Sequence, residues 1–413
     1  MDRISPLPDD LILKILSFPP TKVAITTSLL SKRWRDVWKH VPKLEYFAPR
    51  ASTFIQNFLI LHKAPVLKTM HVELAQNHRP TDIEIWLRVA VERGVRKLRF
   101  HNNPFGPKEA IRLPGSLYTC QTLVSLTLLY TFIVDVPLTI CFPSLKTLRL
   151  RAPAMVRVEF SNDEIVPRIL SGCPVLEGLA ITRVNNGNMK TFTIMVPSLL
   201  RLTVLDLKSG SQVPGDDIGL MIAAPSLTSL TVFSQVSCSL VNMPCLVKAY
   251  IKLSSPGDSK KLLQFLTSAE HLSLCAIPST FSYPIGVFYH LVSLVLCTCC
   301  SVWFCLILRQ TPKLRVLRFR PIERCFDYVQ IQWEQTSSVP QCLISSLKTV
   351  EWIDYQGRES EKKTVMYLLK NSGQLKKMAI KALPSTNLGD RYKMLQELSS
   401  TQRSSKQCQF FFT

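Results

Sequence analysis

The chain has 413 residues, of which 46% are hydrophobic and 19% charged, so it can bury a large core and is not broadly disordered. Its 14 glycines argue against glycine-rich nucleotide-binding loops, and its formal net charge of +21 favours an acidic partner surface, nucleic acid or anionic lipid. No run of five or six Lys or Arg residues occurs, so neither a nucleic-acid arm nor a polybasic lipid anchor is indicated.

The N-terminal residues MDRISPLPDD contain no apolar stretch of the kind that a signal peptide needs. We therefore expect the 13 cysteines to be reduced thiols of an intracellular protein, in the cytoplasm or the nucleus. Residues 291–308 reach about the minimum length of a transmembrane helix. A repeat strand is favoured there, because Leu291, Leu294 and Leu296 continue a pattern that recurs along the chain, and no membrane association is expected.

The residue pattern of segment 5–46 predicts three short helices separated by turn signals. The first helix would begin at Asp9 and end before Pro19, because proline disfavours a helical conformation in the residue that precedes it. The second, capped by Thr21, would extend through residue 30, and the third would begin at Ser31 and carry two tryptophans. About forty residues cannot bury so much apolar surface alone, so the segment packs either on its own chain or on another protein.

The motifs LPDDLILKIL, PTK, SLLSKRWRDVW and VPKLEY resemble the F-box over its full length, and this resemblance defines an F-box domain over residues 1–47. It implies docking on a SKP-family adaptor through Leu7, Pro8, Ile12, Ile15, Leu16, Leu30, Arg33 and Trp34. The resemblance also implies that Arg33 and Trp34 help to lock the helices together. Pro19 stands where the family usually has Leu and Val23 where it often has Asp, and Pro19 would shorten the first helix and weaken docking.

From residue 64 onward, a frame of the form apolar-x-x-apolar-x-apolar recurs thirteen times at intervals of 19 to 33 residues, which is typical of leucine-rich repeats. The frames begin at Leu67, Val95, Leu123, Leu145, Leu176, Leu199, Leu227, Leu246, Ala269, Leu291, Leu314, Leu347 and Leu375. The alternation of apolar and other residues at the end of each frame predicts a strand. The fourth and sixth residues of the frame would then enter the core. We therefore predict an α/β fold in which residues 64–335 form an irregular solenoid, with a parallel sheet inside and helices or loops outside.

The repeats are divergent, because the asparagine or cysteine usual at the ninth position is found only at places such as Asn103 and Cys299. In this they resemble the repeats of plant F-box proteins.

The third and fifth frame positions should form the exposed inner face of the sheet. They supply Lys97, Arg99, Arg149, Arg201, Lys248, Arg318 and Lys377, with His71 and His271, against one acid, Glu351. Because guanidinium pairs bidentately with carboxylate or phosphate, we predict that the first six of these bases bind an acidic or phosphorylated protein substrate. A solvated face without a partner is the alternative.

The C-terminal residues 339–413 predict a strand-helix-strand-helix-strand module that caps the repeats. Val365, Leu368 and Leu369 share one face of its first helix, and Gly373 is placed to end that helix. The stretches SVPQCLISSLKTVEW, YLLKNSGQLKKMAI and LQELSS to CQFFF resemble the FBD module of plant F-box proteins. The resemblance implies no chemistry for this module.

An enzyme is not indicated, because phosphate-loop, dinucleotide, HExxH and GxSxG motifs are all absent from the sequence. The CxxC pair Cys297 and Cys300 lacks a second pair and a His partner, so we expect no metal and no cofactor. A nucleic-acid role lacks stacking aromatics, since Tyr250 is the one aromatic at the inner-face positions.

The three resemblances together imply a non-catalytic substrate receptor of an SCF ubiquitin ligase, acting in protein ubiquitination. It would join a SKP-family adaptor, and through it a cullin, to a protein substrate. The alternatives are a repeat scaffold outside any ligase and a nucleic-acid-binding protein with a basic face.

Overall fold

The protein is described from a computed structural model that covers residues 7–48, 52–74, 79–101, 111–129, 132–134, 136–151, 159–160, 164–185, 191–208, 219–234, 237–241, 243–253, 259–276, 286–298, 304–321 and 338–413. The predicted repeat asparagine Asn103 and the cysteines Cys299 and Cys300 lie outside these residues. The chain divides into two compact units, Met1–Ile218 and Gly219–Thr413, which are described separately.

The N-terminal segment begins with α1 (Asp9–Leu16) and α2 (Thr21–Thr26), followed by the 3₁₀ helices η1 (Thr27–Leu29) and η2 (Val37–His40). The end of α1 before Pro19 confirms the prediction. The predicted third helix from Ser31 is wrong, because turns lead there into η2. Trp34 and Trp38 are both buried, so tertiary packing stabilises this irregular segment in addition to its short 3₁₀ hydrogen bonds.

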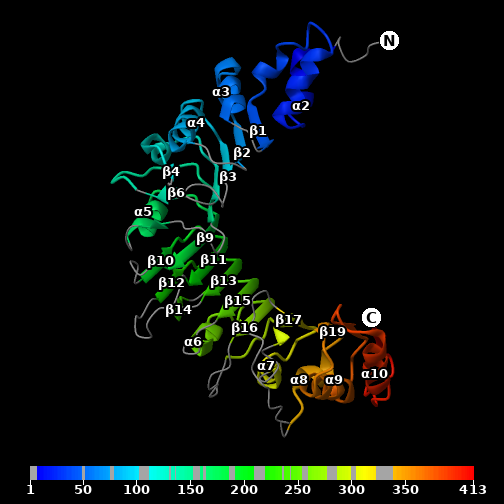
Figure 1. Cartoon of the computed structure of the whole chain (residues 1–413). Coiled ribbons are helices and arrows are strands. Elements are labelled where there is room, and N and C mark those ends of the chain that lie inside the picture. The colour runs from blue at the N-terminus through cyan, green and yellow to red at the C-terminus, as the bar shows by residue number, and fades with distance from the viewer. Residues whose placement is uncertain are drawn as a thin grey trace. The chain divides into compact units, whose positions relative to one another are not determined.

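The first unit contains parallel strands that pair in chain order, with helices on one side of them (Figure 1). The strands are β1 (Lys43–Ala48), β2 (Thr69–Leu74), β3 (Lys97–His101), β5 (Ser125–Leu129), β7 (Thr147–Arg151), β9 (Gly178–Asn185) and β11 (Arg201–Lys208). The helices are α3 (Ser52–Leu61), α4 (Pro80–Glu92), η3 (Gly115–Thr119) and α5 (Ile165–Ser171). Four short strands lie outside this sheet: β4 (Ile111–Arg112), β6 (Phe132–Val134), β8 (Glu159–Phe160) and β10 (Thr191–Met195).

Strand β1 begins inside the predicted F-box segment, yet it pairs along its whole length with β2 in the repeat sheet. Its residues Leu44 and Tyr46 are buried, as the alternating frame requires. The repeat sheet therefore begins at Lys43, before the first predicted frame, and shares this strand with the N-terminal helices.

The second unit repeats the same plan with parallel strands in chain order. Its main strands are β13 (Ser229–Ser234), β15 (Lys248–Leu253), β16 (His271–Ala276), β17 (Ser293–Leu296), β18 (Val316–Phe319), β19 (Thr349–Tyr355), β20 (Lys377–Ala382) and β21 (Gln409–Phe412). Two further strands, β12 (Gly219–Ala223) and β14 (Ser237–Leu240), pair with each other. The helices are α6 (Ser259–Gln264), α7 (Phe304–Arg309), α8 (Gln341–Ser345), α9 (Glu359–Asn371) and α10 (Leu388–Ser399).

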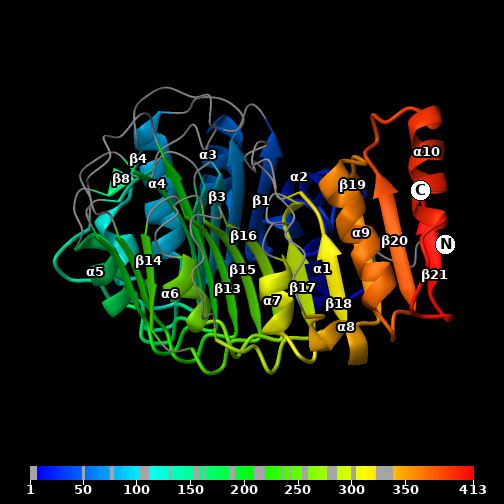
Figure 2. The same ribbon diagram turned by 90° about the horizontal axis from the view of Figure 1, so that it is seen from below.

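The end of this unit confirms the predicted strand-helix-strand-helix-strand order, as β19, α9, β20, α10 and β21 (Figure 2). Helix α9 ends at Asn371, next to the predicted stop at Gly373. Its Val365, Leu368 and Leu369 are buried, as the helical spacing predicted.

The core confirms the repeat frame. The residue that opens each of the thirteen frames is at most 1% exposed, from Leu67 to Leu375. The fourth and sixth residues are buried as well, and neighbouring strands pair position by position, so that Met70 lies beside Leu98 and Val72 beside Phe100. Leucines at matching heights therefore stack into a continuous apolar layer, which is how repeats too small to fold alone stabilise each other.

The apolar stretch 291–308 is divided between strand β17 and helix α7 over its described residues. Among the helices that the structure describes, none has the length and hydropathy needed to cross a membrane.

Candidate functional site

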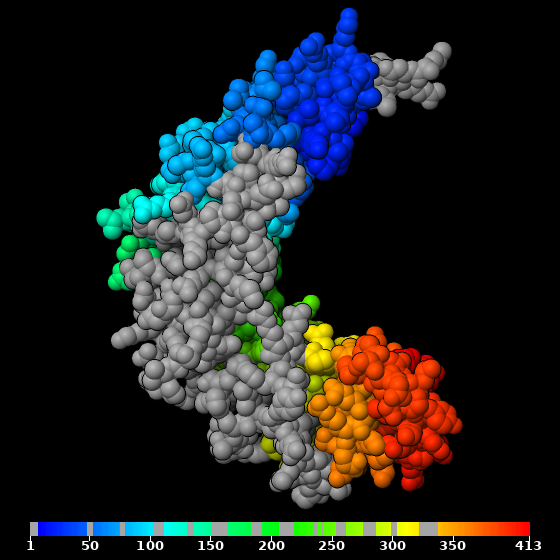
Figure 3. Space-filling view, viewed as in Figure 1, coloured from blue at the N-terminus to red at the C-terminus, as the bar shows by residue number. Residues whose placement is uncertain are grey.

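The N-terminal helices expose a set of large apolar side chains, although their interior is well packed. The exposed residues are Leu11, Ile15, Phe18, Val23, Leu29 and Leu30, with exposed fractions from 43% to 87%. Figure 3 shows the surface of this segment, coloured dark blue, at one end of the first unit. So much apolar surface within about twenty residues is typical of a protein docking site, and we call this set the apolar patch.

Helix α1 is apolar on two sides, and only one of them faces solvent. Ile12 and Leu16 are at most 1% exposed, whereas Leu11 and Ile15 are 47% and 43% exposed. Trp34 is also buried, at 3%. The burial of Ile12, Leu16 and Trp34 leaves them almost no surface for a partner, so we revise their expected role from direct contact to support of the patch.

The remaining predicted adaptor residues lie at the surface. Leu7 is half-buried, while Pro8, Ile15, Leu30 and Arg33 are exposed. The sequence prediction missed Leu11, Phe18, Val23 and Leu29. The spacing of Leu11, Ile15 and Phe18, at four and then three residues, is the helical signal that could have found part of this face.

Polar contacts hold the N-terminal helices to each other and to β1. Arg33 Nη2 lies 2.8 Å from Asp9 Oδ1 at the start of α1. The Lys43 ammonium donates to the carbonyl of Ser17 at 2.8 Å, just beyond the end of α1. The Thr21 hydroxyl, predicted as a helix cap, instead accepts from the Glu45 amide at 2.8 Å. These contacts hold in place the helices that carry the apolar patch.

The predicted basic residues of the first unit lie on the face of the sheet opposite the core. Lys97, Arg99, Arg149 and Arg201 are all exposed. Arg99 and Arg149 share one row, with Thr127 between them, so about 10 Å of sheet separates their backbones. Among the residues that the structure describes, no carboxylate lies within 4.0 Å of Lys97, Arg149 or Arg201, so their charges are open to a ligand.

Arg201 lies over a glycine of the neighbouring strand. Its guanidinium nitrogens lie 3.7 and 3.8 Å from where a Cβ of Gly178 would stand, and the Thr147 hydroxyl is also 3.7 Å from that point. The guanidinium therefore reaches across β9 toward β7. A Cβ at Gly178 would stand in ordinary van der Waals contact with this guanidinium.

The basic residues of the second unit are partly neutralised. Arg318 Nε lies 2.6 Å from Glu351 Oε2, and the Lys377 ammonium lies 4.0 Å from Glu351 Oε1. Lys248 is exposed, and none of the described carboxylates is paired with it. Glu351, the one acid at the inner-face positions of the frames, therefore partly neutralises two bases of this face.

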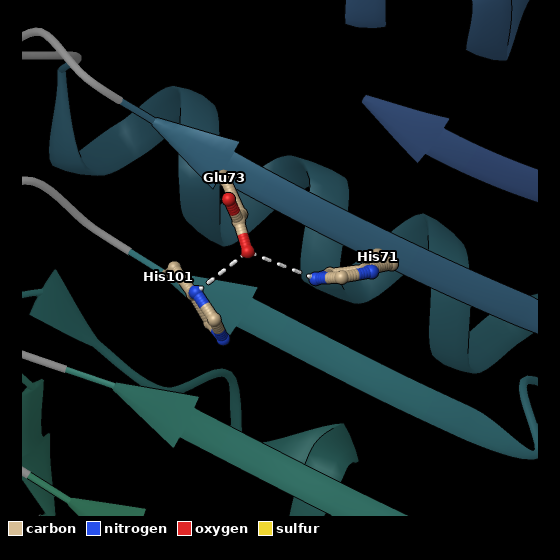
Figure 4. A group of neighbouring side chains, drawn as sticks. All are labelled: His71, Glu73 and His101. Carbon is tan, nitrogen blue, oxygen red and sulfur yellow. Dashed lines mark ion pairs between the residues drawn. The ribbon is translucent and has the colours of Figure 1, made fainter. Parts of the chain in front are cut away.

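A cluster of two histidines and a glutamate lies on the same face of the first unit (Figure 4). His71 and Glu73 are two residues apart on β2, so they project from the same face of the sheet. His101 lies directly beside Glu73 on the neighbouring strand β3. Glu73 Oε1 is 3.0 Å from His101 Nδ1 and 3.4 Å from His71 Nε2. Arg99 Nε donates to His101 Nε2 at 2.8 Å.

Both histidines of this cluster are held in the neutral form. Burial, with a smaller contribution from the Arg99 charge, lowers the pKa of His101 to about 4. Burial and Arg99 also lower the pKa of His71, against the opposing effect of Glu73. The inner-face positions of the six-residue frame include His71 but not Glu73 or His101, because these two occupy the seventh position, one residue beyond the frame.

The described cysteine of the CxxC pair and its neighbour on α7 are packed in the core. Cys297 and Cys305 are at most 4% exposed. Burial raises the pKa of the Cys305 thiol to about 12, so it is protonated at neutral pH. Such a thiol behaves as a small apolar side chain.

Family models match three segments of the chain in this order. The F-box domain model matches residues 4–46, the model of the leucine-rich repeats of FBD-associated F-box protein At5g56370 matches residues 83–250, and the FBD model matches residues 334–380. The fold and these matches define a protein with an N-terminal F-box, leucine-rich repeats and a C-terminal FBD.

Similar proteins from Arabidopsis thaliana narrow this class further. The chain is 56% identical over 442 aligned residues to FBD-associated F-box protein At5g56440, with both chains covered completely. It is 38% identical to F-box/FBD/LRR-repeat protein At5g56420, covering 100% of this chain and 99% of that protein. It is 37% identical to FBD-associated F-box protein At4g10400, with full coverage of both. The chain belongs to the family of FBD-associated F-box proteins with leucine-rich repeats.

Proposed function

We propose that this protein is the substrate-receptor subunit of an SCF ubiquitin ligase. The F-box would bind a SKP-family adaptor, and through it a cullin, while the repeats bind a protein substrate. The observation that carries this proposal is the apolar patch, because six large apolar side chains exposed on a braced helical framework form a surface suited to another protein.

The proposed role is non-catalytic. Holding the substrate near a recruited ubiquitin-conjugating enzyme raises its effective concentration, and this accelerates transfer without any chemistry on the receptor. Such a receptor works inside the cell, and we expect this protein in the cytoplasm or the nucleus.

Capture from cells tests the adaptor interaction. Deleting the F-box would be a poor test, because it removes β1 and exposes the edge of β2. Paired substitution of Leu11→Asp and Ile15→Asp leaves the sheet intact and places two charges on the patch. We expect the adaptor and the cullin to disappear from the captured material, while captured substrates remain.

A matched control is Ile60→Asp, since Ile60 is 78% exposed on α3 of the same unit but lies outside the apolar patch. It should retain the adaptor and the cullin. Loss of both with this control, or their retention with the double variant, would contradict the proposed docking surface.

The inner face of the repeats is the proposed substrate-binding surface. Lys97, Arg99, Arg149 and Arg201 in the first unit carry the proposal best, because none of the four is paired with a described carboxylate, although Arg99 donates to His101. In the second unit, Lys248 and the partly neutralised Arg318 would contribute. An acidic or phosphorylated segment fits this chemistry, because guanidinium groups bind carboxylate and phosphate oxygens in pairs.

Charge reversal tests this surface. The double variant Arg149→Glu and Arg201→Glu should abolish substrate capture while the adaptor stays bound. Arg112→Glu is the control, because Arg112 is an exposed base on β4, outside the main sheet. Salt-sensitive binding of DNA or RNA by the unmodified protein, with no captured protein substrate, would favour the nucleic-acid alternative.

A further inference from the structure

The cluster on β2 and β3 has the composition and the spacing of a metal site. Among the described residues it is the one group of three or more His, Cys, Asp or Glu side chains whose ligand atoms lie within 4.8 Å of one another. All three side chains project from the same face of two adjacent strands and point toward a common centre (Figure 4).

The distances match those of ligands around zinc. Two ligands bound to zinc at about 2.0–2.1 Å with a tetrahedral angle lie roughly 3.3 Å apart. Glu73 Oε1 is 3.0 Å from His101 Nδ1 and 3.4 Å from His71 Nε2, so two of the three ligand pairs already have this separation. The two imidazole nitrogens lie within 4.8 Å of each other and would have to approach to about 3.3 Å, and solvent can supply the remaining ligand.

One atom of the cluster is unsatisfied. His71 Nε2 is shielded from solvent, and its 3.4 Å approach to Glu73 Oε1 does not have the geometry of a hydrogen bond. A buried polar atom without a hydrogen-bond partner is uncommon in folded proteins. A cation between His71 and Glu73 would supply the missing partner.

We propose that His71, Glu73 and His101 form a binding site for a divalent cation of the zinc class. Two imidazoles and one carboxylate suit zinc and its neighbours cobalt and nickel, whereas magnesium and calcium prefer oxygen ligands alone. This site is independent of adaptor docking, because none of its residues belongs to the apolar patch.

Arg99 competes with the cation in this arrangement. It donates to His101 Nε2, so His101 carries its proton on Nδ1, the atom that faces Glu73. Metal binding at Nδ1 requires this proton to move to Nε2, and the Arg99 hydrogen bond is then lost. The exposed Arg99 side chain can turn away into solvent, and its charge becomes available to a ligand of the inner face.

Titration of the purified full-length protein tests the proposal. After chelator treatment and under reducing conditions, we would measure Zn²⁺ binding by calorimetry and Co²⁺ binding by its visible absorption. The unmodified protein should bind one ion with the absorption of nitrogen and oxygen ligands in a tetrahedral field. The double variant His71→Ala and His101→Ala should lose about 100-fold or more in affinity. Removing a residue that only supports a metal ligand already costs about 10–100-fold, and this variant removes two ligands.

Two further variants test whether the ion binds at this cluster. Arg99→Leu should bind the ion more tightly than the unmodified protein, because the competing hydrogen bond is gone. His271→Ala, which removes an exposed histidine on β16 of the second unit, should leave affinity unchanged.

Binding that persists in the double histidine variant, or Co²⁺ absorption typical of thiolate ligands, would assign the ion to cysteines and overturn the proposal. So would the absence of binding to the unmodified protein at micromolar concentrations. Circular dichroism and adaptor binding of each variant confirm that the fold is retained, so failure here leaves the ligase proposal intact.

Discussion

His62 donates a hydrogen bond from Nε2 to the main-chain carbonyl of Val41 at 2.8 Å. Val41 belongs to the N-terminal F-box segment, and His62 follows α3. On the other side of the ring, Arg93 Nη1 lies 3.0 Å from His62 Nδ1, and its Nη2 donates to the carbonyl of Leu59 at 2.9 Å. Because a carbonyl only accepts and a guanidinium only donates, both contacts require the same neutral tautomer of His62.

This junction predicts a pH dependence of stability. Burial, with a smaller effect of the Arg93 charge, lowers the pKa of His62 below its ordinary value of 6.5. The unfolded chain therefore binds a proton on His62 at a pH where the folded chain does not, and folding is favoured as pH rises. Its stabilising contribution should be complete above about pH 6.5 and be lost as pH falls through the folded pKa.

Chemical denaturation between pH 7.5 and 4.5 measures this effect. His62→Gln should reduce the dependence in this range, because the amide can keep a donor toward Val41 but does not titrate, while the contributions of His71 and His101 remain. The control His290→Gln removes an exposed histidine of the second unit and should leave the profile unchanged. An identical pH profile for His62→Gln and the unmodified protein would contradict the assignment.

The two sides of α1 should respond differently to truncation. Ile12→Ala should lower the free energy of unfolding by about 2–5 kcal/mol, because Ile12 is fully buried. Ile15→Ala should change it by no more than about 0.5 kcal/mol, because Ile15 is 43% exposed, yet it should weaken adaptor binding. Denaturation and adaptor titration on both variants check this, and a loss of stability with unchanged binding for Ile15→Ala would refute the division.

Glu361 is expected to be important for the C-terminal FBD module. Its buried side chain accepts from the main-chain amides of Gln356 at 2.9 Å and Arg358 at 3.2 Å, at the start of α9. Glu361→Ala should cost about 1–3 kcal/mol, because it leaves these donors unsatisfied. Glu361→Gln should cost less, because the amide oxygen can still accept from both.

The matched control is Glu359→Ala, which removes a 73% exposed carboxylate from the same helix turn. Thermal unfolding of the three variants should rank Glu361→Ala as least stable. Equal melting temperatures for Glu361→Ala and Glu359→Ala would show that the two hydrogen bonds contribute little.

Glu351 is expected to limit anion binding in the second unit. Glu351→Gln removes the charge that pairs with Arg318 at 2.6 Å, and should raise the affinity of this unit's inner face for an acidic peptide. Stability should change by no more than about 1 kcal/mol, because the pair is partly exposed. Fluorescence titration with a phosphorylated peptide checks this, and unchanged affinity would mean that Arg318 does not contact the peptide.

The repeat sheet could be predicted from sequence because its signal is local. Each frame carries its own alternation of apolar residues, and the burial of Leu67, Met70 and Val72 follows directly from it. The N-terminal strand β1 was missed although Val41, Leu44 and Tyr46 complete the same frame and are all buried, because the stretch VPKLEY was assigned to the F-box and not to the repeats.

The sites were harder to predict because they depend on tertiary contacts. Apolar residues occupy two sides of α1, so their spacing in the sequence does not say whether Ile12 or Ile15 faces solvent. His71 and His101 are thirty residues apart and meet only because β2 and β3 pair in register. The pairing of Arg318 with Glu351 likewise depends on strand register, which charge counting ignores.

Adaptor docking on the apolar patch is tested most sharply by calorimetric titration of the purified full-length protein with a purified SKP-family adaptor. We predict one-to-one binding at micromolar concentration or below, lost in the double variant Leu11→Asp and Ile15→Asp and retained in Ile60→Asp. Absence of binding by the unmodified, folded protein to any SKP-family adaptor would show that the apolar patch is not a docking surface for this class of partner.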